Sequence, residues 1–175
     1  MSYPVKPSFK LEKFLPEDFE LYLSLVQNLE VMQMITERSL SVAEAESEFA
    51  QLIVKNKFHP ALGNYKILDL EHNQFMGLAK LEIEEVTSTT AELGYMLLPQ
   101  YWGKGIASQV AKSLIEKAYA QQNLRQLQAI IDPANVASRK ILTNNGFSSK
   151  EFKDFDGLAG EILVLEFNQA KHASL

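Results

Sequence analysis

The chain has 175 residues, of which 46% are hydrophobic and 22% charged, so its size and composition fit one globular domain spanning residues 1–175. It contains no cysteine, which excludes thiol nucleophiles, disulfides and thiolate-ligated metals. Its net charge of −5 argues against a nucleic-acid partner, and the lack of a signal peptide or an apolar membrane span predicts a cytoplasmic protein with no membrane partner.

The first third of the chain predicts one strand and two helices. Residues Phe9–Lys13 alternate apolar and polar side chains, as a half-buried strand does. Pro16-Glu17-Asp18 is typical of a helix start, because proline tolerates the first turn and carboxylates complement the helix dipole. Ser41 with Glu44 three residues later forms a capping box for the second helix. The apolar stripes expected on the two helices are Leu21, Leu25 and Leu29, and then Val42, Ala45, Phe49, Leu52 and Ile53.

The middle of the chain predicts three strands and a long helix. The strands are expected at Tyr65–Asp69, Phe75–Glu84 and Thr90–Leu98. Pro99 ends the third strand, because proline cannot donate to a sheet ladder. A helix then runs from Ile106 to about Gln121, with a ridge of apolar residues at helical spacing: Ile106, Val110, Leu114 and Ala118.

The last part of the chain predicts a strand, a helix and a final hairpin. A short apolar strand at Leu127–Ile131 precedes a helix over about Asn135–Asn145. Strands at Phe147–Phe155 and Gly160–Phe167 follow, joined by a turn at Asp156-Gly157. Consecutive strands followed by a strand–helix–strand crossover predict a mixed sheet flanked by helices, which places the fold in the α/β class in its α+β form.

One glycine-containing loop, Gln100–Ala107, lies between a strand end and the start of the long helix. Gly103 and Gly105 let the backbone approach a ligand, and the free amides of a helix start favour an anion such as a phosphate. A plain tight turn is the alternative. A P-loop is excluded because Lys104 is followed by glycine instead of serine or threonine. A dinucleotide-binding module remains a further alternative, although Asp132 is too distant to serve as its acidic residue.

Two blocks of residues resemble the GNAT superfamily of N-acetyltransferases. Gln100-x-x-Gly103-x-Gly105 resembles its acyl-CoA-binding signature. Together with Glu92-Leu93-Gly94-Tyr95, the run from Tyr101 to Ala107 looks like the subgroup that contains the ribosomal-protein N-terminal acetyltransferases. The second block of that subgroup is matched by Asn135-x-x-Ser138-Arg139-Lys140-x-Leu142 and then Asn145-Gly146-Phe147. The resemblance covers about residues 65–168, whereas the N-terminal third matches only in its layout.

The resemblance implies a GNAT-like fold with acetyl-CoA as co-substrate and no metal. The sheet would be mostly antiparallel, with one parallel pair of strands splayed apart to admit the pantetheine arm. Backbone groups of Met96, Leu97 and Leu98 would bond that arm. The amides of Gly103, Lys104, Gly105, Ile106 and Ala107 would hold the pyrophosphate. Asn135 and Ser138 would contact the lower cofactor and Arg139 its phosphates, with a solvated cation on a helix face as the alternative for Arg139.

Acetyl transfer to an amine needs a base for the amine proton and an acid for the departing thiolate. With no cysteine, direct attack within a ternary complex is expected. Glu92 is the candidate base, with a surface carboxylate at a strand end as the alternative. Many relatives place a tyrosine acid where this chain has Leu142, so Ser138 becomes the candidate donor, unless it only caps a helix or contacts the cofactor. Tyr95 is another candidate donor, although an alternating strand can equally bury it.

The function expected from the resemblance is transfer of an acetyl group from acetyl-CoA to a primary amine, on a protein N-terminal residue or a small molecule. The alternative is a non-catalytic acyl-CoA-binding regulatory protein. Relatives often pair through terminal strands, so a homodimer is also expected. An acidic patch of Glu82, Glu84 and Glu85 either attracts a cationic substrate or is a solvated strand end. The three histidines lack the spacing of metal ligands.

Overall fold

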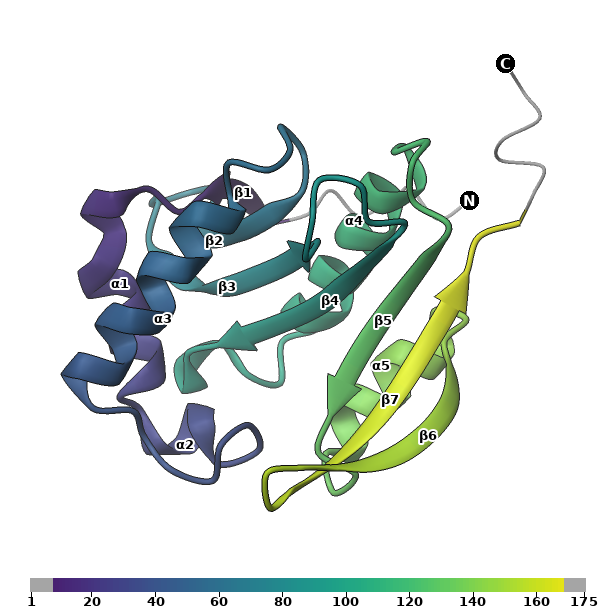
Figure 1. The fold of residues 1–175 in the computed structure, drawn as a ribbon. Helices are drawn as coiled ribbons and strands as arrows, with labels where there is room; N and C mark the ends of the chain where they lie inside the picture. Colours follow the sequence, from purple (N-terminus) through teal and green to yellow (C-terminus); the bar gives the residue numbers. More distant parts are fainter. Residues whose placement is uncertain (1–7, 169–175) are drawn as a thin grey trace, which may run out of the picture.

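One seven-stranded sheet organises the chain in the computed structural model, which describes residues 8–168. The strands are β1 (Phe9–Lys13), β2 (Gly63–Asp69), β3 (Phe75–Glu82), β4 (Thr90–Leu97), β5 (Gln126–Ile131), β6 (Ser148–Phe155) and β7 (Leu158–Glu166). They lie in the order β1-β2-β3-β4-β5-β7-β6, and only the β4–β5 pair is parallel. The predicted class, a mixed sheet flanked by helices, is therefore confirmed (Figure 1).

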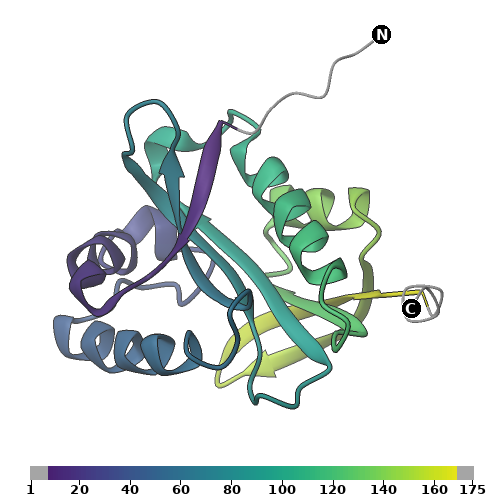
Figure 2. The ribbon, with the colours of Figure 1, turned by 90° about the horizontal axis from the view of Figure 1, so that it is seen from above.

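The helices cover both faces of the sheet. They are α1 (Phe19–Val26), α2 (Leu29–Met32), α3 (Val42–Lys55), α4 (Ile106–Tyr119) and α5 (Val136–Asn144), with short 3₁₀ turns at Pro16–Asp18 and Pro99–Tyr101. Helices α1 to α3 lie on one face, and α4 and α5 lie on the other (Figures 1 and 2). Each face has its own apolar cluster. The cluster under α1 to α3 is centred on Phe14, whose ring contacts Tyr22, Phe49 and Phe75 edge-on.

The local signals in the sequence placed most elements correctly. The capping box that opens α3 is confirmed, because the Glu44 amide donates to Ser41 Oγ over 3.2 Å and the Ser41 amide donates to Glu44 Oε1 over 3.1 Å. The predicted ridge of α4 is fully buried. The stripe predicted for the first helix is wrong at Leu29, which is 56% exposed. Helix α1 ends at Val26 and Asn28 caps the separate helix α2, so the four-residue spacing does not continue.

Strands β4 and β5 pair along only part of their length. Thr90–Glu92 pairs with Gln126–Gln128, and no register between these strands follows beyond Glu92. The rest of β4 keeps its antiparallel partner β3 on the other edge. The two strands diverge visibly in Figure 1, which confirms the splayed parallel pair that the resemblance implied. Their open edges create the space in which the candidate site lies.

We expect Gly77→Ala to destabilise the protein, because β3 and β4 approach closely at this position. A Cβ built on Gly77 would lie 2.0 Å from the Met96 carbonyl oxygen and 3.0 Å from Leu97 Cα, and both are backbone atoms. The strands would have to separate, at a cost of roughly 1–3 kcal/mol or more. Urea unfolding measures this cost. Gly94→Ala is the matched control, because its Cβ would meet only Lys80 Cβ at 3.9 Å; equal stability of the two variants would contradict the argument.

Candidate active site

Two cavities meet at the open edge of β4. The glycine-loop cavity, about 600 Å³, is lined by Trp102, Gly103 and Gly105 and by the first residues of α4. The carboxylate cavity, about 480 Å³, is lined by Glu48, Glu82 and Glu92 together with many apolar side chains. Six residues line both cavities: Met34, Ile35, Tyr95, Met96, Asn135 and Ser138. These shared residues place the two cavities on either side of one junction.

The loop before α4 has the backbone of an anion site. Gly103 and Gly105 have φ values of +73° and +77°, in the left-handed region that favours glycine. Gly105 is the N-cap of α4 and no side chain caps the helix, so no side chain satisfies its first amides. Ile106 and Ala107 line the cavity with the two glycines. Lys104 is exposed and does not line the cavity, so a cofactor contact there would use its backbone amide.

The edge of β4 next to this loop is partly occupied by protein groups. Met96 and Leu97 line the glycine-loop cavity, and the Leu97 carbonyl accepts a hydrogen bond of 2.8 Å from Trp102 Nε1. The Leu98 amide donates to the Met76 carbonyl over 2.9 Å, and Leu98 does not line the cavity. The backbone contact predicted for Leu98 is therefore not supported, because its amide continues the antiparallel ladder with β3.

The first turn of α5 lies at the junction of the cavities. The Asn135 side chain caps the helix by accepting a 3.1 Å hydrogen bond from the Ser138 amide. Arg139 on the next position lines neither cavity. Its guanidinium donates to Glu161 on β7, with 2.9 Å from Nε to Oε1, and to the Pro133 carbonyl over 2.7 Å. The phosphate contact predicted for Arg139 is not supported by this geometry, because its donors are directed to these two acceptors.

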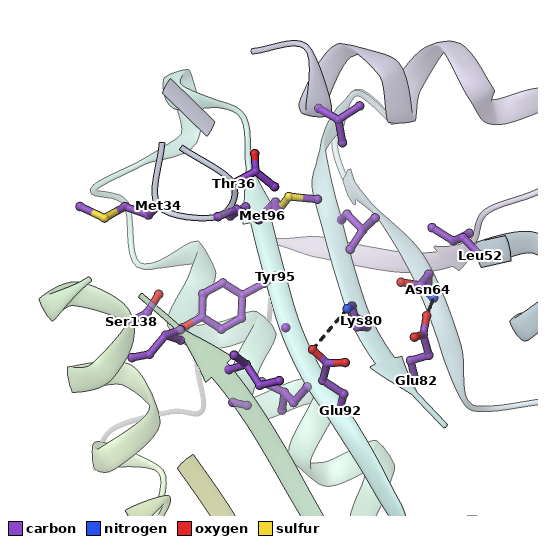
Figure 3. A pocket seen from close by; sticks show the side chains of 18 of the residues that line it. Met34, Thr36, Leu52, Asn64, Lys80, Glu82, Glu92, Tyr95, Met96 and Ser138 are labelled. Atoms are coloured by element: carbon purple, nitrogen blue, oxygen red, sulfur yellow. Dashed lines mark hydrogen bonds and ion pairs between the residues drawn. The ribbon is translucent and has the colours of Figure 1, made fainter. Parts of the chain in front are cut away.

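Tyr95 and Ser138 come together from β4 and α5 (Figure 3). The Tyr95 hydroxyl is buried, and within residues 8–168 it has no hydrogen-bond partner of good geometry. Burial raises the pKa of Tyr95, and the neighbouring Ser138 hydroxyl partly offsets that rise. Leu142, at the position where relatives place a tyrosine acid, is 1% exposed and lines the carboxylate cavity. Tyr95 is thus a buried phenol directed to the junction, which the sequence pattern alone left ambiguous.

Glu92 lies in the carboxylate cavity on the strand that carries Tyr95 (Figure 3). Its Oε1 is 3.4 Å from Lys80 Nζ, and its side chain is 33% exposed. Solvent and substrate can therefore reach the carboxylate. The predicted base therefore lines the carboxylate cavity and does not lie on a distant surface.

The polar end of the carboxylate cavity combines residues from α3, β2 and β3. The Glu82 carboxylate accepts a hydrogen bond of 2.7 Å from Asn64 Nδ2 and one of 3.0 Å from Lys55 Nζ. Burial raises the pKa of Glu82, but the hydrogen bonds and the nearby lysines outweigh it, so its pKa lies below the usual range. Residues of the predicted acidic patch therefore differ in their surroundings. The Glu82 side chain is 11% exposed and lines the cavity, whereas the Glu84 side chain is 76% exposed.

Sequence reasoning missed most residues of this polar end. Glu48, Asn64 and Lys55 belong to the part of the chain without family motifs, and no local spacing links them. Met34 and Ile35, in the turn after α2, were also not expected at the site. Within residues 8–168, no group of three His, Asp or Glu side chains could hold a metal, and no helix is long and apolar enough to span a membrane.

Comparisons with known proteins agree with this geometry. The family described as Acetyltransferase (GNAT) domain matches residues 9–148. A protein from Bacillus licheniformis, named uncharacterized N-acetyltransferase p20, is 23% identical over 154 residues, which cover 87% of this chain and 86% of the relative.

Solved structures share the fold. The spermidine N-acetyltransferase from Vibrio cholerae, in complex with CoA and spermine, superposes with a TM-score of 0.76 at 16% identity, covering 97% of this chain and all of the other. The RimL ribosomal L7/L12 alpha-N-protein acetyltransferase, in complex with coenzyme A, gives a TM-score of 0.75 at 18% identity, covering 93% of this chain and 96% of the other.

Proposed function

This chain is a member of the GNAT acetyltransferase family, an acyltransferase, and we propose that it transfers the acetyl group of acetyl-CoA to a primary amine by direct attack in a ternary complex. The observation that carries the proposal is the junction of the two cavities. A loop with free amides lies on one side, and a reachable carboxylate lies on the other. Tyr95 and Ser138 stand between them, where an acyl group and an amine would meet.

Acetyl-CoA fits the glycine-loop cavity in charge and shape. Backbone amides at the start of α4 favour the pyrophosphate, since an uncapped helix N-terminus binds anions. The open edge of β4 at Met96 and Leu97 offers backbone groups for the amide-containing pantetheine arm. Bound acetyl-CoA would supply the thioester. Asn135 and Ser138 would position its reactive end, because both also line the carboxylate cavity.

We assign the base to Glu92. An amine must lose a proton before or during attack, and a positioned carboxylate accepts it directly or through one water. Lys80 Nζ lies 3.4 Å from Glu92 Oε1. Both residues line the carboxylate cavity, on the side from which an amine would approach.

Two hydroxyl groups are placed to donate to the departing thiolate. Ser138 is the donor predicted from the sequence, and Tyr95 is the one that the geometry favours. A phenol has a reference pKa of about 10, close to that of a thiol at about 8.5, whereas a serine hydroxyl has no side-chain pKa in this range. The Tyr95 hydroxyl is buried next to Ser138, and no protein acceptor in the described chain holds it with good hydrogen-bond geometry. We therefore assign donation to Tyr95, with Ser138 as its neighbour.

The charges of the carboxylate cavity support an amine with one positive charge and an apolar body. Glu48, Glu82 and Glu92 face Lys55 and Lys80, which leaves one negative charge uncompensated. Most of the remaining lining is apolar, including three methionines, which adapt to varied shapes: Met32, Met34 and Met96. Both a small-molecule amine and the terminal residue of a protein fit a cavity of about 480 Å³.

We also propose that residues 1–175 form a single domain and that the protein is a cytoplasmic homodimer.

The first test is binding of acetyl-CoA followed by Trp102 fluorescence. Trp102 is the only tryptophan, and its side chain lines the glycine-loop cavity. We expect saturable binding of acetyl-CoA, with NAD and ATP as controls, and thiol release when amines and N-terminal peptides are screened. If the fluorescence of Trp102 does not change, calorimetry measures whether acetyl-CoA binds. Binding without transfer to any acceptor would favour the non-catalytic binding protein, and tighter binding of NAD than of acetyl-CoA would overturn the proposal.

Glu92→Gln should lower kcat by about 10²- to 10⁴-fold, the usual contribution of a positioned base. The affinity for acetyl-CoA should not change, because Glu92 lines only the carboxylate cavity. Steady-state kinetics and calorimetry measure the two effects. Glu85→Gln is the matched control, since Glu85 is exposed and outside both cavities. Unchanged turnover of Glu92→Gln at saturating acetyl-CoA would remove Glu92 as the base.

Tyr95→Phe should lower kcat by about tenfold or more, and Ser138→Ala should lower it less. The phenylalanine keeps the ring in place and removes only the hydroxyl. Because burial raises the pKa of Tyr95 above its usual value near 10, the wild-type rate should show no loss of this acid below about pH 10. Rate profiles against pH measure this. A larger effect of Ser138→Ala than of Tyr95→Phe would assign donation to Ser138 instead.

A further inference from the structure

Glu161 is a buried carboxylate on β7, the strand next to the edge strand β6. Its residue is 1% exposed, and β7 lies between β5 and β6. It is paired in register with Ile131, the last residue of β5, where the chain leaves the sheet for α5. Such a buried charge is unfavourable unless it is paired and hydrogen-bonded. The hydrogen bond from Arg139 lowers the pKa of Glu161 and keeps it ionised despite burial.

The same guanidinium also holds the segment that precedes α5. Arg139 donates to the Pro133 carbonyl over 2.7 Å while its Nε donates to Glu161 Oε1 over 2.9 Å. One rigid, planar group thus connects three points of the chain: the turn after β5, the first part of α5 and the centre of β7. Lysine could not reproduce this arrangement, because its ammonium lacks the fixed directions of the guanidinium donors.

Helix α5 has little apolar packing to fix its first turn. Leu142 is its only buried residue, and it lies in the second half of the helix. Val136, at the start of the helix, is 67% exposed. Yet this first turn carries Asn135 and Ser138, which line both cavities. Its position therefore depends on polar contacts more than on burial of apolar surface.

We propose that the Arg139–Glu161 ion pair positions the first turn of α5, and thereby sets where Asn135 and Ser138 meet the acyl donor. The inference rests on the proposed function. Arg139 and Glu161 are positioning residues, because they act through Asn135 and Ser138. Displacement of a positioning group by about 1 Å lowers rates by as much as roughly a hundredfold.

The test compares three variants with the wild type. Arg139→Lys keeps the charge but loses the planar fork, and Glu161→Gln keeps the shape but loses the charge. The double variant Arg139→Met with Glu161→Leu replaces the buried pair by apolar residues, which often preserves stability. Glu12→Gln is the matched control, because Glu12 forms an exposed pair with Lys10 on β1, remote from both cavities.

Circular dichroism first shows which variants remain folded. For these variants, calorimetry measures the affinity for acetyl-CoA, and steady-state kinetics measures kcat with the amine that gives the fastest thiol release. We expect both single variants to lose roughly tenfold to a hundredfold in kcat, in acetyl-CoA affinity or in both. The double variant should have a melting temperature close to that of the wild type, but it should show the same loss of kcat or acetyl-CoA affinity as the single variants. If it instead regains wild-type affinity and turnover, the pair serves only the fold and the inference is overturned.

A double-mutant cycle separates positioning from general destabilisation. If Arg139 acts through Ser138, Arg139→Lys lowers kcat and acetyl-CoA affinity much less in a Ser138→Ala background than in the wild type. If Arg139→Lys lowers kcat and acetyl-CoA affinity by the same factor in both backgrounds, the inference is overturned. This test does not depend on Glu161→Gln remaining folded. If the wild-type chain binds acetyl-CoA but transfers no acetyl group, the proposed function is contradicted. The inference about α5 is then still tested, because the double-mutant cycle can be measured by acetyl-CoA affinity alone.

Discussion

The separation of β4 from β5 is the constraint on which the rest of the site depends. Their parallel pairing stops after Glu92, so the facing edges beyond it lack strand partners. Unpaired backbone groups are tolerated where water or a ligand can reach them. The same divergence brings the glycine loop before α4, the exposed edge of β4 and the first turn of α5 around one opening (Figure 1). Acetyl transfer needs such an opening, because donor and acceptor must meet from opposite sides.

Local fields, and not the net charge of −5, decide what this acidic chain binds. The proposed anion site would use backbone amides, which need no counter-charge and are fixed by the loop and helix. Arg139, which the resemblance placed at the cofactor phosphates, is paired with Glu161 instead. In the carboxylate cavity, Lys80 is paired with Glu92 and Lys55 with Glu82. The charges of the carboxylate cavity nearly balance as a result, in line with the proposed acceptor, an amine of low charge.

The two faces of the sheet contribute differently to the site. Under α1 to α3, the aromatic cluster around Phe14 gives the carboxylate cavity a well-packed wall. On the other face, the buried ridge of α4 fixes the helix whose start faces the anion site. Helix α5 buries only Leu142, and its first turn carries residues of both cavities. A functional group held by few contacts is sensitive to the geometry of each one.

The sequence by itself determined the order of the strands and of the longer helices, but not the separate helix α2, together with the capping of α3, the glycine loop and the residues at the two motif blocks. These features depend on residues a few positions apart, whose spacing sets periodicity, caps and turns. It could not determine that Arg139 meets Glu161, 22 positions away, or that Glu48 and Asn64 share a cavity with Glu92. Those contacts exist only after strand order and register are fixed. Tyr95 shows the same limit, since alternation along β4 gives its face but only tertiary packing buries its hydroxyl next to Ser138.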